Sequence, residues 1–310
     1  MLKGYTKQEI SWMMYDWANS AHSVIIVTLL PIFFDTVAGY TADSVSSMST
    51  WGYATSIAML IVALAAPFLG VFGDIRGMRK KLFSFFMLLG VAACAGMAFT
   101  PGMDFTSGPV AAGKVASLIL VLYIVSVIGF DASAIYYDAF LTDVTTEDRM
   151  DKVSTMGYGL GYIGGSTIPL LIFLIMNLVG VPMLTCLAFV FGLTAVWWLA
   201  FSLPLLKNCE QTSGKPYEKG DVARSIKGVG TTIKEIIANK PMLIYILSYF
   251  FYIDGVHTVI SMATTYGTNL GLDSTGMMLA LLLVQILGLP FCLLYIKCSE
   301  KFGARTMVGF

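Results

Sequence analysis

The chain has 310 residues, no formal net charge and a markedly apolar composition: 57% of its residues are hydrophobic, 12% are charged, and the mean hydropathy is +0.78. Soluble domains average about 25% charged residues, so this composition excludes an ordinary soluble protein and indicates lipid as the solvent. A net charge of zero identifies no partner, and we expect no nucleic acid among the partners.

Eight apolar runs are long enough to cross a bilayer, which needs about 20 residues per helix. These runs are 12–35, 49–72, 82–100, 115–140, 154–178, 182–206, 241–267 and 274–297, and a ninth begins at Thr306. The first run is long and lacks a small-residue cleavage site, so we predict a retained span rather than a signal peptide. In the sixth run, Trp197 and Trp198 stand near the predicted inner end, where aromatic rings favour the membrane interface.

Lysine and arginine positions predict the topology. If the N-terminus is cytoplasmic, every one of the 19 basic residues except Lys114 falls in a predicted cytoplasmic segment. This is the distribution that the positive-inside rule describes. We therefore predict an integral, multi-pass membrane protein whose N-terminus is cytoplasmic.

The longest polar stretch, 207–240, separates six predicted spans from the two that follow. Its second part, from Val222 to Ile237, has isoleucines at roughly helical intervals: Ile226, Ile233, Ile236 and Ile237. This part is either an amphipathic helix on the inner leaflet or an irregular linker, and the sequence does not decide between them. We predict a six-helix half over 1–206, a cytoplasmic linker over 207–240 and an incomplete second half over 241–310.

A short acid-x-x-Gly-x-Arg turn occurs twice. The first copy contains Asp74, Gly77 and Arg79, and the second runs from Glu300 to Arg305. Each copy follows the second apolar run of its half, a repeat typical of secondary transporters built from two structural units. Twelve spans are expected of a full repeat, so we predict an all-α polytopic bundle truncated after about eight to nine of twelve helices, and we favour a fragment.

Ionisable groups inside apolar spans are costly and usually functional. Six of them lie on the first span of a three-span unit: Asp16 and His22, Asp131 and Asp138, and Asp254 and His257. Asp16 and Asp138 lie near the cytoplasmic surface, so a solvated or helix-capping role is as reasonable for them as a functional one. Asp131 and Asp254 are too deep for that role and are predicted to face a central cavity, while the two histidines are either cavity or core residues.

A second pair of matching segments supports the prediction of two structural repeats. His22 to Ile25 matches His257 to Ile260, and this register places Asn19 opposite Asp254. Counting about 1.5 Å per helical residue also places Asn19 and Asp131 at similar depths. We predict all of these polar residues to be candidates for binding substrate or protons.

Gly159 to Gly164 matches the GxGxxG pattern of dinucleotide-binding folds, but that function needs a preceding strand, which an apolar span does not provide. Glycines four residues apart, Gly157, Gly161 and Gly165, instead predict a small-residue surface for close helix packing. Pro169 offers a kink a few residues later. Two histidines cannot form a usual three-ligand zinc site without carboxylates, so we expect neither a metal nor a cofactor.

Three segments carry a resemblance to a known family. Tyr15 to Ala21 resembles the span 1 signature of the vacuole-effluxer (autophagy-related) family within the major facilitator superfamily. Tyr137 to Leu141, with Gly157 to Gly165, resembles the span 4–5 region of that family, and Phe251 to Val256 resembles its span 7. The sequence departs from the family where His22 replaces an aromatic residue and Asp138 replaces an asparagine.

The loop between the second and third spans is similar to a conserved turn of the superfamily, although Ile75 stands where an arginine is frequent. The resemblance implies that this loop is a conformational latch on the inner face, formed by Gly70, Asp74, Gly77, Arg79 and Lys80. Asp74 is expected to cap the following turn or to pair with a basic group such as Arg149.

The resemblance implies a major-facilitator-type helical bundle and a secondary active transporter that moves a small solute by alternating access. Amino acids are one candidate substrate, because fungal members are implicated in exporting them, and Asp131 or Asp254 is a candidate for proton coupling. We expect a monomer in a bacterial plasma membrane rather than a vacuolar one. The alternatives are a non-transporting membrane sensor or scaffold and a polytopic membrane enzyme.

Overall fold

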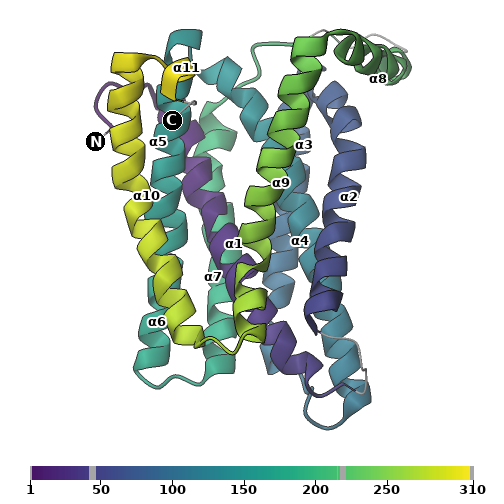
Figure 1. The fold of residues 1–310 in the computed structure, drawn as a ribbon, viewed down its shortest axis with the longest axis vertical. Coiled ribbons are helices and arrows are strands. Elements are labelled where there is room, and N and C mark those ends of the chain that lie inside the picture. Colours follow the sequence, from purple (N-terminus) through teal and green to yellow (C-terminus); the bar gives the residue numbers. More distant parts are fainter. Residues whose placement is uncertain (1, 42–46, 215, 217–220, 308–310) are drawn as a thin grey trace.

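The computed structural model describes residues 2–41, 47–214, 216 and 221–307, which form a bundle of helices without strands (Figure 1). Within this part of the chain, eight helical segments are long and apolar enough to cross a membrane. Both the all-α class and the number of spans are therefore confirmed.

The first six spans lie before the polar segment. They are α1 (Lys7–Ala38), α2 (Ser47–Gly73), α3 (Met78–Met97), α4 (Pro109–Val144), a fifth span formed by α5 (Met150–Leu160), η3 (Gly161–Ser166) and α6 (Thr167–Leu178), and α7 (Met183–Asn208). The short 3₁₀ segments η1 (Thr100–Gly102) and η2 (Glu147–Arg149) precede α4 and α5.

The later helices are α8 (Asp221–Ala238), α9 (Lys240–Asn269), α10 (Ser274–Phe302) and the short α11 (Ala304–Met307). The second part of the polar segment is thus helical. The run expected from Thr306 begins within α11, and its remaining residues, 308–310, lie outside the described chain.

Local sequence determines where the helices begin. At α1, Thr6 Oγ1 accepts a hydrogen bond from the Glu9 amide at 3.1 Å, and the Glu9 carboxylate accepts one from the Thr6 amide at 2.7 Å. This reciprocal capping box satisfies two amide groups that would otherwise have no partner. Before α3, Gly77 adopts φ +82°, a left-handed conformation that favours glycine and explains its place in the acid-x-x-Gly-x-Arg turn.

The fifth span is not the simple kinked α-helix that Pro169 suggested. Six residues, Gly161–Ser166, form a π-helical turn just before the proline. Proline has no amide hydrogen, and its ring crowds the carbonyl group four residues earlier, which disfavours regular α-helical bonding here. Such π-bulges are frequent at functional sites.

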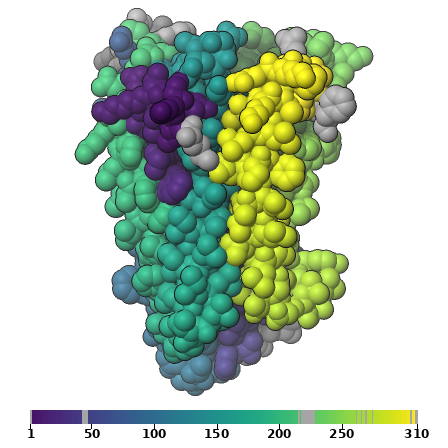
Figure 2. All heavy atoms as spheres, turned by 90° about the vertical axis from the view of Figure 1, so that its left-hand side faces the viewer, coloured from purple at the N-terminus to yellow at the C-terminus, as the bar shows by residue number. Residues whose placement is uncertain are grey.

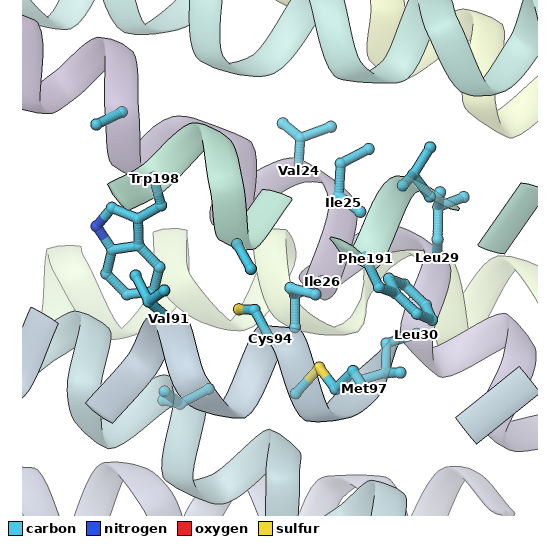
Figure 3. Close-up of a cluster of buried hydrophobic side chains, with 14 of the residues drawn as sticks. Val24, Ile25, Ile26, Leu29, Leu30, Val91, Cys94, Met97, Phe191 and Trp198 are labelled. Carbon is cyan, nitrogen blue, oxygen red and sulfur yellow. The ribbon is translucent and has the colours of Figure 1, made fainter. Parts of the chain in front are cut away.

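One part of the core of the first six spans lies between α1, α3 and α7 (Figure 3). Ile26, Cys94 and Phe191 meet there, and Trp198 lies against Val91 of α3. Trp198 is fully buried, so its expected place at the membrane interface is wrong. Its ring occupies the space that Gly90 leaves, because a Cβ on Gly90 would lie 2.4 Å from the ring.

The later helices lie against one side of this core. α10 runs beside α5 and η3 (Figure 2), and α9 contacts α1 and α2. The start of α1, the start of α5 and the end of α10 lie at the same end of the bundle, and α8 also lies there (Figure 1).

Candidate functional site

Polar and aromatic side chains form a continuous contact between α1 and α4. We call this contact, which runs from Trp12 to His22 on α1, the seam. At one end the Trp12 indole stacks on Tyr137, with ring centroids 4.3 Å apart, and donates to the Tyr137 carbonyl at 2.9 Å. The Tyr15 hydroxyl lies 2.8 Å from Ser133 Oγ. Because Ser133 itself donates to the Phe130 carbonyl, the tyrosine must be the donor between these two hydroxyls.

His22 lies further along the same seam and is buried. Its Nε2 is 3.2 Å from Ser126 Oγ, and its ring stacks on Phe130 at 4.8 Å. Ser126 donates its proton to the Tyr123 carbonyl, so Nε2 of His22 must be the donor and Nδ1 carries no proton. This Nδ1 has no hydrogen-bond partner among the described residues.

Asp131 follows Phe130 directly and is half-buried. Its Oδ2 atom is buried and has no hydrogen-bond partner in the described part of the chain. An unpartnered buried carboxylate oxygen is costly, because desolvation is not offset by a hydrogen bond. It marks this position as one where a proton or a ligand would relieve the cost.

Asp16 and Asp138 lie nearer the end of the bundle that holds the N-terminus. The Tyr137 hydroxyl donates to Asp16 Oδ2 at 2.8 Å, so the seam partly satisfies this carboxylate. Asp138 is exposed and directly follows Tyr137, the residue that binds Asp16. The structure therefore joins Asp16 to α4 through Tyr137, whereas Asp131 is half-buried and its buried Oδ2 has no partner among the described residues.

The glycine face of the fifth span lies against α1. A Cβ at Gly157 would be 2.5 Å from Asp16 Oδ2, one at Gly161 would be 2.5 Å from Ser20 Oγ, and one at Gly165 would be 2.4 Å from the Trp17 carbonyl oxygen. The segments that carry the family resemblance in α1 and the fifth span are thus packed against each other at backbone distance.

Asn19 is buried on α1, beside this contact. Asp254 and His257 instead have exposed side chains on α9. The predicted site residues of the two halves are therefore not joined into one closed cluster within the described structure.

The predicted latch loop is held by a network centred on Arg79. The Arg79 guanidinium pairs with Asp143 at the end of α4 and donates to the Ala139 carbonyl at 2.9 Å. Asp74 lies 4.0 Å from Arg79 with its side chain 81% exposed. The suggested Asp74–Arg149 pair is wrong: Arg149 binds Glu9 instead, through Nε at 2.8 Å and Nη2 at 2.9 Å.

The residues that follow α7 bind the latch loop and Asp143 through hydrogen bonds, a contact that was not predicted from the sequence. Gln211 Oε1 accepts from the Gly77 amide at 2.8 Å, and its Nε2 donates to the Gly73 carbonyl at 2.9 Å. Asp143 Oδ1 accepts from the amide and hydroxyl groups of both Thr212 and Ser213, at 2.8–3.1 Å. We call Gln211–Ser213 the linker clasp.

Two contacts connect the fifth span to α10. Lys152 Nζ and Glu300 Oε1 are 2.7 Å apart at the end of the bundle that holds the N-terminus. Glu300 is the acidic residue of the second acid-x-x-Gly-x-Arg turn, whereas the side chain of Arg305 lies outside the described set. Deeper in the bundle, a Cβ at Gly288 would lie 2.5 Å from the Tyr162 ring, so α10 approaches the fifth span closely.

The site chemistry consists of carboxylates, one buried imidazole and hydroxyl groups. No group of three or more His, Cys, Asp or Glu side chains suitable for a metal ion occurs among the described residues. This arrangement can bind protons and polar solutes along helices that pack at backbone distance.

Comparison with solved structures identifies related folds. Two solved structures share the fold. A D-xylose–proton symporter matches with a TM-score of 0.59 and 15% identity, covering 96% of this chain and 69% of that one. The xylose transporter XylE from E. coli, in a partially occluded inward-open state, matches with a TM-score of 0.56 and 14% identity, covering 96% of this chain and 73% of that one. At these identities the likeness establishes the fold alone.

The sequence comparisons identify the family. A profile described as "Vacuole effluxer Atg22 like" matches residues 39–150 and 142–309. An uncharacterised MFS-type transporter of Bacillus subtilis, YxiO, is 39% identical over 99% of this chain and 71% of its own length. Autophagy-related protein 22-1 of Sclerotinia sclerotiorum is 24% identical over 50% of this chain but only 29% of its own length.

The chain belongs to the vacuole effluxer Atg22-like family. It is an integral, multi-pass membrane protein of a transporter family, and the resemblance drawn from the signature segments is confirmed.

Proposed function

We propose that this protein is a secondary active transporter that moves a small solute by alternating access, with its site along α1, α4 and α9. The observation that carries the proposal is the buried, unpartnered Oδ2 of Asp131, deep inside a span of a transporter-family protein. Ionisable groups in such positions line substrate or proton pathways.

The charges inside the spans support a cationic group on the solute. Asp131 and Asp254 lie in the interior of their spans, and Asp16 and Asp138 lie nearer the ends, whereas the Lys and Arg residues stand near or beyond the helix ends. A carboxylate in a poorly solvated cavity favours a proton or an ammonium group as its partner. Asp254 is the better candidate for an ammonium group, because its counterpart Asn19 is uncharged and the cavity is electrically asymmetric.

The proposal extends to details that the family relationship leaves open. The solute is an amino acid or a similar amine, coupling is to protons, and the protein acts as a monomer in a bacterial plasma membrane with a cytoplasmic N-terminus. The chain divides into a six-helix half (1–206), a linker (207–240) and a second transmembrane part (241–310). The positive-inside distribution and the two turns at Asp74 and Glu300 support this arrangement.

The test uses the protein reconstituted in liposomes with a pH gradient and a panel of radiolabelled amino acids and amines. If Asp131 couples transport to protons, Asp131→Asn loses accumulation driven by the gradient but keeps substrate counterflow, which needs no net proton movement. Asp254→Asn weakens both processes for solutes that carry an ammonium group. Asp104→Asn, which makes the same change in an exposed loop, is the matched control and transports normally.

Two outcomes would count against the proposal. Normal transport by both span variants at all pH values would remove proton coupling at Asp131 and amine binding at Asp254. A correctly inserted wild-type protein that moves none of the solutes would favour the sensor or scaffold alternative.

A further inference from the structure

The helix α8 is held at the end of the bundle by its connection to a span. α8 ends at Ala238 and α9 begins at Lys240, so one residue separates them. Asn239 continues the hydrogen bonding across this junction: its amide donates to the Glu235 carbonyl at 3.0 Å, and its carbonyl accepts from the Leu243 amide at 2.9 Å. Because α9 crosses the membrane, α8 must end at the membrane surface.

α8 lies across the direction of the spans, beside the ends of α2 and α9 (Figure 1). A helix placed in this way runs roughly along the membrane surface rather than away from it. It lies at the same end of the bundle as the Lys152–Glu300 pair and the start of α1.

One face of α8 is apolar, and its neighbours cover it only in part. Val229, Ile233, Ile236 and Ile237 follow one another at helical intervals on a single face. Ile233 is 49% exposed and Ile237 is 59% exposed, whereas Val229 and Ile236 are half-buried. The side chain of Ile226, which has the same spacing, lies outside the described set.

The exposed apolar surface continues from α8 into the first turns of α9. Met242, Ile244 and Tyr245 are 46%, 54% and 70% exposed and belong to α9, which is long and apolar enough to cross a membrane. The apolar face of α8 is therefore continuous with the apolar start of a span, and lipid is the occupant that can cover both.

The charge of this segment identifies the kind of lipid. Basic residues outnumber acidic ones in 207–240, and four of them stand in or beside the helix: Arg224, Lys227, Lys234 and Lys240. Amphipathic helices with this composition lie in the interface and bind anionic phospholipids. A cytosolic protein partner would not require the apolar face to continue into a span.

We infer that α8 is a membrane-surface helix that binds anionic phospholipid headgroups, with its isoleucine face among the acyl chains. The inference does not depend on which solute is transported. Its consequence is mechanical: the lipid bound by α8 holds the polar segment between α7 and α9 against the leaflet at the point where α9 enters the membrane.

The experiment measures hydrogen exchange of the α8 amides in nanodiscs of phosphatidylcholine alone and of phosphatidylcholine with phosphatidylglycerol. We expect slower exchange in the anionic nanodiscs. A surface lysine contributes about a fivefold change in affinity for anionic lipid, so Lys234→Gln with Lys240→Gln should remove most of the difference. Lys297→Gln with Lys301→Gln makes the same change of charge at the end of α10 and should keep it.

A second double variant separates the apolar contribution. Ile233→Ser with Ile237→Ser should speed α8 exchange in both kinds of nanodisc, while the α3 amides stay protected because the fold is intact. Wild-type exchange that is the same in both lipids would overturn the inference. So would loss of the lipid dependence in the α10 control, or protection of α8 that arises only when a cytosolic protein is added.

Discussion

Replacing Asp143 by asparagine tests whether the ion pair at the end of α4 holds the latch loop. The change keeps the size of the side chain and removes only its charge. In the structure one Asp143 oxygen faces the Arg79 guanidinium and the other accepts hydrogen bonds from Thr212 and Ser213. An asparagine can keep one set of these contacts but must direct its NH₂ group at the other set of donors.

The magnitude follows from burial. The side chains of Arg79 and Asp143 are 6% and 0% exposed, so water cannot replace the lost partner. Removing one member of a buried ion pair costs about 3–5 kcal/mol, because the remaining charge is left uncompensated. For a chain of 310 residues, 3 kcal/mol corresponds to a fall in melting temperature of roughly 5 °C.

The assay is thermal unfolding in detergent, and Asp74→Asn is the matched control. Asp74 carries the same charge near the same arginine, but its side chain is 81% exposed and lies 4.0 Å away. Exposed pairs contribute about 0–1 kcal/mol, so this variant should melt within a few degrees of the wild type. Equal melting temperatures for wild type and Asp143→Asn would refute the reasoning, as would equal falls for the two variants.

Three further predictions concern the moving parts. Asp74→Asn should insert normally but transport more slowly in liposomes if the loop is a latch, and wild-type flux would count against that role. Gly161→Leu should cost about 1–3 kcal/mol of stability, because its Cβ would be 2.5 Å from Ser20 Oγ, whereas Gly70→Leu has nothing within 4 Å and should be neutral by the same melting assay. Glu300→Lys should separate α5 from α10 at the end of the bundle that holds the N-terminus, and labelling of a cysteine introduced there should become faster. Adding Lys152→Glu should restore the ion pair and slow the labelling again. Labelling that is unchanged by both substitutions would contradict a gating role.

The spans could be predicted from sequence because their signal is local. Twenty apolar residues in succession have few structures available in lipid, so composition alone determined how many helices cross the membrane. The glycines of the fifth span are a similar case, since spacing by four residues defines a helix face without knowledge of the partner. The sequence could not show that the partner face is α1, or that the span contains a π-helical turn.

The contacts that could not be predicted from the sequence join residues far apart in the chain. Asp143 pairs with Arg79 and binds the linker clasp, but nothing near Asp143 in sequence indicates either partner. The partner of Arg149 is Glu9, which stands in the first turn of α1 and 140 positions away in sequence. A usable signal existed there: Glu9 follows Thr6 by three residues, the spacing of a capping box. The burial of Trp198 could not be predicted, because its partner Gly90 is small and gives no hydropathy signal.

The packing also determines which parts can move relative to one another. α1 meets α4 through stacked aromatic rings and meets the fifth span at backbone distance, so these three spans cannot separate without leaving large voids. Asp16, Asp131 and His22 are therefore carried on one rigid unit. The contact between α5 and α10 is different, because at one end it includes an exposed ion pair that water can replace. We expect rocking to occur at this contact and at the contacts of α9, so that the distance between Asp131 and Asp254 is what changes when the site turns from one side of the membrane to the other.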